Sequence, residues 1–128
     1  MDTTTTKADT ALAELRLENG LLRLAIKMRA RRDMIKTQLE ASDGGWTTTL
    51  ELCGSLDGLR DAAAVIETHA DQPILLADQL DGMAIRAEKR AHGTRDESRA
   101  ETLKFYARKV EQWLYQAQKV GAFVPSND

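Results

Sequence analysis

The side chains of this 128-residue chain that are best suited to chemistry are two histidines, one cysteine and scattered carboxylates. Glu88 and His92 are four residues apart, so on a helix they share a face that can in principle hold a metal ion. Carboxylate-bridged metal sites in helical bundles use repeated Glu-x-x-His pairs, and the sequence contains none. We therefore interpret this pair as a solvated helix end.

The other candidates are weaker. Glu67 and His69 are two residues apart and diverge on a helix, and Cys53 has no partner at a useful spacing and resembles a small buried hydrophobe. Glu97 and Glu101 share a helical face without a repeated Glu-x-x-Glu motif. Phosphate-binding glycine loops and nucleophile elbows are also absent from the sequence. The sequence thus predicts a protein that is not an enzyme, with no catalytic residues, metal or cofactor.

Charge is segregated along the chain although the total is only −2. Residues 40–81 contain nine acidic residues and one base. Residues 1–39 contain eight bases against five acids, and residues 86–109 contain eight bases against four acids. Such segregation bears on partners rather than on the fold.

The acidic segment favours a protein partner. Asp57 and Asp61 are expected to point outward from their helix and to complement a basic surface, although an ordinary solvated face has the same composition. Phe105 is expected opposite the buried row of its helix, where an exposed ring serves as a contact anchor or folds under the tail. These three residues form the predicted partner-binding set.

The basic segment supports nucleic-acid binding as an alternative. Arg29, Arg32 and Lys36 share one helical face and are the candidates for contacting phosphates. In basic-region zippers the basic stretch precedes the zipper, whereas here it follows the apolar stripe described next. A solvated face that pairs with acids of a neighbouring helix is the simpler interpretation.

The first helix carries an apolar stripe with an asparagine in its middle. Its members recur at alternating steps of four and three residues, which is the pattern of a short coiled coil. A buried asparagine lowers stability but sets the register by pairing with its copy on a second chain. The stripe predicts a homodimer interface made of Leu12, Leu15, Asn19, Leu22 and Ile26.

A second apolar row lies on a different side of the same helix. It consists of Leu17, Leu21, Leu24, Met28, Ile35 and Leu39. Two apolar faces require two partners. The rest of the chain is expected to cover this second row, and a second copy is expected to cover the stripe.

The predicted fold class is all-α, a four-helix bundle with a long first helix and a coiled-coil-type homodimer. Helices are expected at about 7–41, 48–70, 73–92 and 94–120, within one domain over 7–124 that lies between a disordered tail (1–6) and a second tail (125–128). Capping boxes are predicted at Thr48 with Glu51 and at Thr94 with Glu97, and Gly93 is expected in the left-handed region. Gly54 and Gly58 are expected to weaken the second helix.

The lone cysteine and the lack of a secretory signal indicate the cytoplasm, and no apolar run is long enough to cross a membrane. We expect a small non-catalytic homodimer that binds a macromolecular partner as adaptor, regulator or inhibitor. Motif-poor helical chains of this size are frequent among phage and mobile-element proteins that block host machinery. The alternative function is a nucleic-acid-binding accessory protein that uses the basic end of the first helix.

Overall fold

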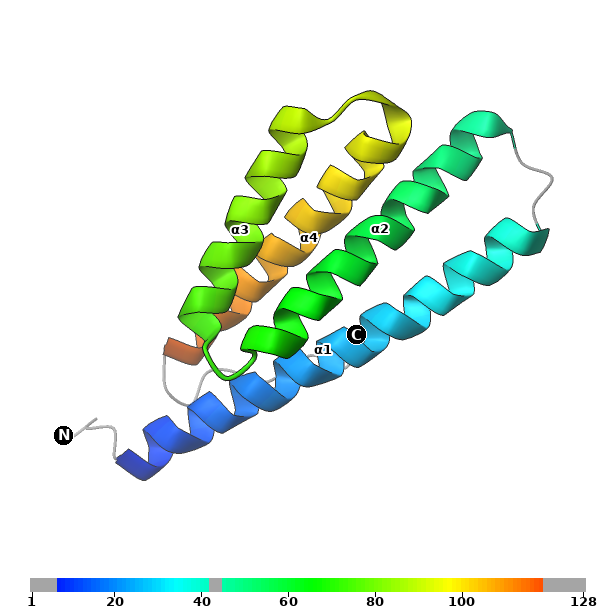
Figure 1. The fold of residues 1–128 in the computed structure, drawn as a ribbon. Coiled ribbons are helices and arrows are strands. Elements are labelled where there is room, and N and C mark those ends of the chain that lie inside the picture. The colour runs from blue at the N-terminus through cyan, green and yellow to red at the C-terminus, as the bar shows by residue number, and fades with distance from the viewer. Residues whose placement is uncertain (1–6, 42–44, 119–128) are drawn as a thin grey trace.

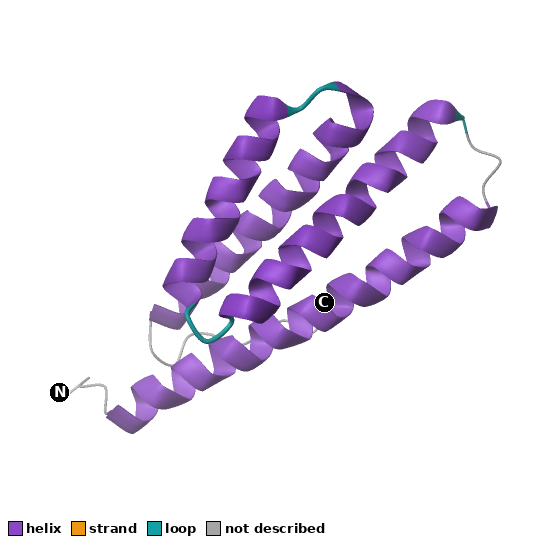
Figure 2. Ribbon diagram, in the orientation of Figure 1, coloured by secondary structure: helices purple, strands orange, loops and turns teal. Residues whose placement is uncertain are grey.

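The computed structural model describes residues 7–41 and 45–118, which form four α-helices (Figure 1). These are α1 (Lys7–Ala41), α2 (Trp46–His69), α3 (Pro73–Arg90) and α4 (Gly93–Gln118). The described part contains no strand (Figure 2). The all-helical class and the four helices are therefore confirmed, and each predicted helix end that falls on a described residue lies within two residues of the observed one. The predicted end of the fourth helix at 120 lies outside the described residues. The predicted tails lie outside the described residues.

The predicted capping box of the second helix is wrong. α2 begins at Trp46, so Thr48 lies inside its first turn, and the N-cap residue is Gly45, without a side-chain capping bond. The backbone N–H of Thr49 donates to the Gly45 carbonyl at 3.1 Å, which closes the first turn. Glycine is nearly as favourable as serine or threonine at the N-cap, so the helix can start without a hydroxyl cap.

The predicted box at the start of α4 is wrong by a small shift along the chain. Thr94 already lies within the helix, and the acid that reaches back is Asp96, whose Oδ2 accepts the backbone N–H of His92 at 3.1 Å. Gly93 has a φ of 86°, as expected for a glycine after the end of α3. The chain thus reverses between α3 and α4 over two residues and a left-handed glycine.

Across the molecule the helices lie in the order α1, α2, α4, α3 (Figure 1). α2 and α4 are central and pack most extensively against each other. α1 lies mainly along α2, and α3 lies mainly along α4. α1 and α3 are therefore edge helices, and each has a side that the other helices leave open.

The core contains the inward rows of all four helices. The second apolar row of α1 faces it as predicted: Leu17, Leu21, Leu24, Met28 and Ile35 are buried, and Leu39 packs at the margin. The largest fully buried side chains are Leu21, Met28, Ile66, Leu76, Leu80, Leu103 and Val110. Burying each large aliphatic side chain stabilises the fold by about 1.5–3 kcal/mol relative to leaving it exposed.

Two glycines allow α2 and α4 to approach closely. A Cβ atom at Gly54 would lie 2.2 Å from the carbonyl oxygen of Arg95 and 2.6 Å from the Cβ of Ser98. A Cβ atom at Gly58 would lie 2.7 Å from the Cβ of Thr102. α2 is continuous through both positions despite the low helix propensity of glycine. The two glycines are therefore explained by the helix packed against them rather than by local structure.

Hydroxyl groups line the same contact. Ser98 Oγ donates to the carbonyl oxygen of Glu51 at 2.6 Å, and the hydroxyls of Ser55 and Ser98 lie 3.2 Å apart. Thr102 Oγ1 donates to the Ser98 carbonyl within α4 at 3.0 Å. Small side chains that bond locally or across the contact occupy little volume, so the two helix backbones stay close.

Replacing Gly54→Ala tests this contact. Alanine normally stabilises a helix by about 1 kcal/mol relative to glycine. Here the added Cβ overlaps α4 backbone, so we expect the free energy of unfolding to fall by about 1–3 kcal/mol in urea denaturation.

Gly82→Ala in α3 is the matched control. A Cβ there would meet only the flexible guanidinium of Arg86, at 3.1 Å. We expect this variant to be as stable as the original protein or more stable. Equal effects of the two substitutions would contradict the role assigned to Gly54.

Candidate interaction surfaces

The predicted dimer stripe of α1 faces away from the other three helices. Leu12, Leu15, Leu22 and Ile26 are 45%, 53%, 37% and 67% exposed, and Asn19 is also exposed. At about 100° per residue, the stripe lies nearly opposite the buried row of the same helix. A row of large aliphatic side chains thus lies on the outer side of an edge helix. Whether a second copy covers it stays a prediction.

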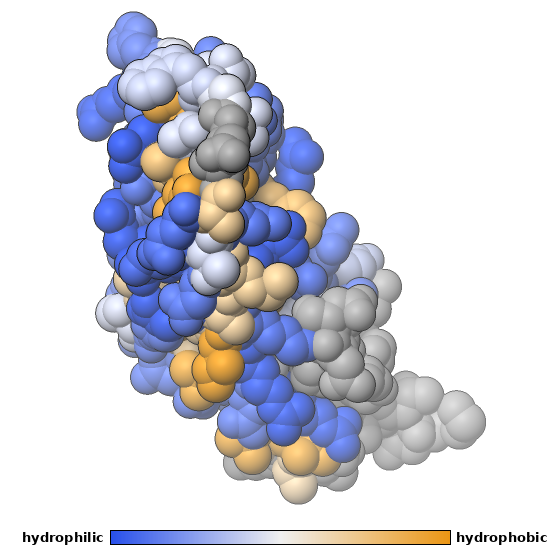
Figure 3. All heavy atoms as spheres, turned by 90° about the vertical axis from the view of Figure 1, so that its right-hand side faces the viewer, coloured by the Kyte–Doolittle hydropathy of each residue, from blue (hydrophilic) through white to orange (hydrophobic). Residues whose placement is uncertain are grey.

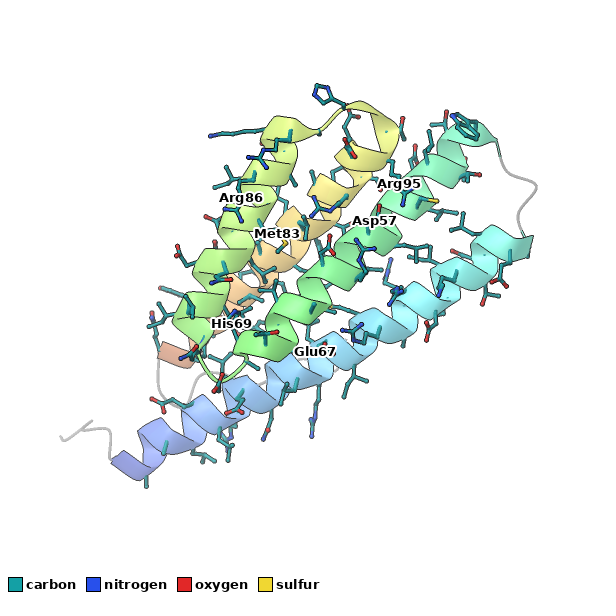
Figure 4. The ribbon with its side chains drawn as sticks, in the orientation of Figure 1. Asp57, Glu67, His69, Met83, Arg86 and Arg95 are labelled. Atoms are coloured by element: carbon teal, nitrogen blue, oxygen red, sulfur yellow. The ribbon has the colours of Figure 1, made fainter. Side chains whose placement is uncertain are left out.

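The expectation that Asp57 and Asp61 point to solvent is wrong. Their side chains are 19% and 23% exposed and lie against α4. Asp57 accepts bonds from Arg95 at 2.8 Å (Nε) and 3.2 Å (Nη2), and the two side chains meet between α2 and α4 (Figure 4). Asp61 accepts a bond from Arg99 Nε at 2.9 Å. The hydrogen bond to Asp57 also raises the pKa of Arg95.

The sequence did contain a signal for these pairs. Asp57 and Asp61 are four residues apart, as are Arg95 and Arg99, so each pair lies on one face of its helix. When the two helices pack side by side, the acidic face of one can form ion pairs with the basic face of the other. Arg60 also bonds to Asp61, at 3.0 Å, so both carboxylates are neutralised within the chain. Binding of a partner by these carboxylates is untested, and it would require separating existing ion pairs.

The basic segment of α1 is also partly neutralised. Arg29 reaches α2, where its Nε donates to Glu67 Oε2 at 2.7 Å and its Nη2 donates to the second carboxylate oxygen. These bonds raise the pKa of Arg29 and lower the pKa of Glu67. Arg32 is half-buried and Lys36 is exposed. The three residues share a helical face as predicted, but Arg29 has a carboxylate partner of its own.

Phe105 is exposed on the outer side of α4, as expected. Its side chain is 59% exposed, and its ring packs edge-on against Tyr106 with centroids 4.9 Å apart and an interplanar angle of 86°. The ammonium of Lys109 lies 6.0 Å from the Phe105 ring and 5.8 Å from the Trp113 ring. This is a cation–π arrangement. An aromatic anchor and a cation therefore share one surface.

Phe105 also lies in a groove that was not predicted from the sequence. One hollow, of about 390 Å³, is lined by residues of α1, α2 and α4. A second hollow, of about 600 Å³, is lined by α4 alone among the described residues and shares Glu101 and Phe105 with the first. We call the two together the α1/α4 groove. Its residues belong to three separate helices, so no local pattern marks them as neighbours.

Unlike Asp57 and Asp61, some acidic residues near the start of α3 are exposed and form no ion pair among the described residues. Asp78, Asp81 and Glu111 surround a hollow of about 740 Å³ next to Ile74 and Leu75, beside the start of α3. Part of the acidic segment therefore stays on the surface, although not at the residues predicted for it. Figure 3 shows another face, on which apolar groups form a narrow band between hydrophilic ones.

The candidates for chemistry are held apart in the described structure. No group of three or more His, Cys, Asp or Glu side chains there is arranged to hold a metal ion. Glu88 bonds to Lys104 at 2.8 Å, which lowers the pKa of Glu88, while His92 is exposed. Cys53 is a partly buried free thiol on α2. The absence of catalysis stays a prediction.

None of the helices as described is long and apolar enough to cross a membrane. The chain matches no protein-family model, no curated protein and no solved structure.

The Arg29–Glu67 pair predicts a pH dependence of stability. Because the folded-state pKa of Glu67 is lowered, the pair contributes stability above the unfolded-state pKa of glutamate and loses it as pH falls through the folded-state pKa. We expect Glu67→Gln to lower the urea midpoint at neutral pH and to leave it unchanged at a pH where Glu67 is protonated. Glu111→Gln is the exposed control, and an equal effect at neutral pH would contradict the assignment.

Proposed function

We propose that this protein is a cytoplasmic, non-catalytic homodimer that binds a macromolecular partner as an adaptor, regulator or inhibitor. The observation that carries the proposal is the α1 stripe. Four large aliphatic side chains lie in a row on the outer side of the helix, nearly opposite the face that the chain itself covers. An apolar row at heptad spacing is what a coiled-coil partner helix packs against.

Charges beside the stripe support a parallel arrangement. With Asn19 at a core position of the heptad, Glu18 and Arg23 flank the stripe on opposite sides. In a parallel, in-register pair the asparagines meet, and Glu18 of each copy lies near Arg23 of the other. An antiparallel pair brings Arg16 of one copy near Arg23 of the other, which is repulsive. The second copy is therefore expected to run parallel.

Partner binding is supported by surfaces that lie away from the stripe. The α1/α4 groove and Phe105 are on other faces, so dimer formation leaves them open. The nucleic-acid alternative has less support, because contact of Arg29 with a phosphate requires separation from Glu67. Because binding surfaces carry the proposal, alanine at His69, His92 or Cys53 is expected to leave partner binding intact.

Charge on the stripe should dissociate the dimer. We expect the wild-type chain to have the mass of a dimer at micromolar concentration and Leu15→Glu/Leu22→Glu to have the mass of a monomer in multi-angle light scattering. The reason is that four carboxylates would be buried without partners. Circular dichroism must show unchanged helicity.

Ile74→Glu/Ile85→Glu on α3 is the matched control, because both side chains are exposed and lie on the other edge helix. This variant should remain dimeric. A monomeric wild-type chain, or a dimer that survives the α1 substitutions, would refute the stripe as the interface.

Crosslinking tests the orientation. In a Cys53→Ser background, Leu12→Cys places the new thiol beside its copy only if the two α1 helices run parallel and in register. In the antiparallel pairing Leu12 faces residue 29, so the two thiols are about 25 Å apart at 1.5 Å per residue. We expect a disulfide-linked dimer on mild oxidation, seen on a non-reducing gel. Its absence from a chain that is dimeric in solution would favour the antiparallel pair.

A further inference from the structure

The α1/α4 groove lies where a further helix could join the fold. α1 packs on α2, and α2 packs on α4, but α1 and α4 touch each other little. The space between them is floored by α2, through Leu52, Ser55 and Leu59. Ile35 of α1 and Tyr106 of α4 form its sides. The groove therefore has an apolar floor and two helical walls, which is the geometry that accepts an amphipathic helix.

The rim of the groove is basic. Arg31 projects from α1, and Lys104, Arg108 and Lys109 project from α4, against the single acid Glu101. Lys104 is already bonded to Glu88 at 2.8 Å. Arg31 and Arg108 are exposed and form no ion pair within 4 Å among the described residues, and Arg108 lies near enough to Glu88 for its charge to help lower the pKa of that carboxyl. The rim thus has cations available for carboxylates of a partner.

The phenol of Tyr106 on α4 lies close to a charged group of α1. Burial raises its pKa, and the nearby charge of Arg31 on α1 acts in the opposite direction. The guanidinium of Arg31 on α1 is therefore close enough to the Tyr106 side chain of α4 to affect its pKa.

We propose that the α1/α4 groove binds an acidic, amphipathic helical segment of a partner protein. The α4 side of the groove runs from Glu101 to Trp113, about 18 Å at 1.5 Å per residue, which matches a segment of about 12 residues. Residues of α1 and α2 line it together with α4 only over the part from Glu101 to Tyr106. Apolar side chains of the segment pack on the floor and on Phe105, and its carboxylates face Arg31 and Arg108. This inference rests on the proposed function in that it names the partner.

The groove favours a peptide over single-stranded nucleic acid. Nucleic-acid grooves present successive aromatic rings for stacking, whereas the floor here is mainly aliphatic and Phe105 is its one strongly exposed ring. A second copy of this chain is accommodated elsewhere, because the groove residues of α1 lie on a different face from the dimer stripe. The acid-rimmed hollow lies between α3 and α4, and among the described residues no third helix forms a floor for it.

The test uses a fluorescent helical peptide of about 16 residues with leucine on one face and glutamate on the other. We expect fluorescence anisotropy to show saturable binding to the full chain that weakens with added salt. Phe105→Ala and Arg31→Glu/Arg108→Glu should each weaken binding about tenfold or more. The altered side chains are exposed, so circular dichroism and the urea midpoint should show an intact fold.

Two matched controls decide whether binding is specific. Arg86→Glu changes the same charge on the exposed side of α3 and should leave peptide affinity within about twofold. A peptide with lysine in place of glutamate should not bind. No binding of the acidic peptide, or equal loss in Arg86→Glu, would overturn the proposal. So would tight binding of an oligothymidine of about 20 nucleotides that the groove variants abolish.

The same titration on Leu15→Glu/Leu22→Glu separates this inference from the proposed dimer. The groove lies on the other side of α1, so the monomeric variant should bind the peptide with unchanged affinity per chain. If the wild-type chain is monomeric and binds the peptide, the groove proposal is supported and the homodimer proposal is refuted. If the wild-type chain is dimeric and does not bind the acidic peptide, the homodimer proposal is supported and the groove proposal is refuted.

Discussion

The close approach of α2 and α4 at Gly54 and Gly58 is the contact on which the rest of the structure depends. A side chain at either position would overlap atoms of α4, so these helices can pack at this distance only because the two residues lack a Cβ. α2 and α4 form the centre of the molecule, and each edge helix packs mainly on one of them. A change in their separation would therefore move both edges.

The same contact decides what the charged residues do. Once α2 and α4 lie side by side, Asp57 meets Arg95 and Asp61 meets Arg99, so part of the acidic segment is neutralised by the basic segment near the end of the chain. Part of the charge segregation along this sequence thus reflects which helices are neighbours. Partly exposed pairs of this kind contribute little stability.

The order α1, α2, α4, α3 also explains why this small fold has open surfaces. α1 covers the core with one side and leaves a row of aliphatic side chains on the other. Because α1 packs against α2 rather than against α4, a groove with a basic rim remains between α1 and α4. Two surfaces of different chemistry thus lie on opposite sides of one helix, so the proposed dimer and the proposed partner do not compete.

The sequence by itself determined the helices, the two faces of α1 and the exposure of Phe105. These follow from local rules, because the 3.6-residue period, the proline at the start of α3 and the glycine at the start of α4 act within one or two turns of chain. The tertiary structure decided the rest. On an isolated helix Asp57 and Asp61 would lie opposite the apolar row and face solvent. They form ion pairs within the chain only because α4 packs beside them.

Gly54 and Gly58 illustrate the same division. Read locally, they weaken a helix, yet in the fold they are the reason that α2 and α4 fit together. The α1/α4 groove is formed by residues up to 82 positions apart, from Arg31 to Trp113, and no spacing within one helix predicts that they meet. Local periodicity shows which face of a helix is apolar, whereas the choice of neighbour depends on side-chain volumes contributed by two distant segments.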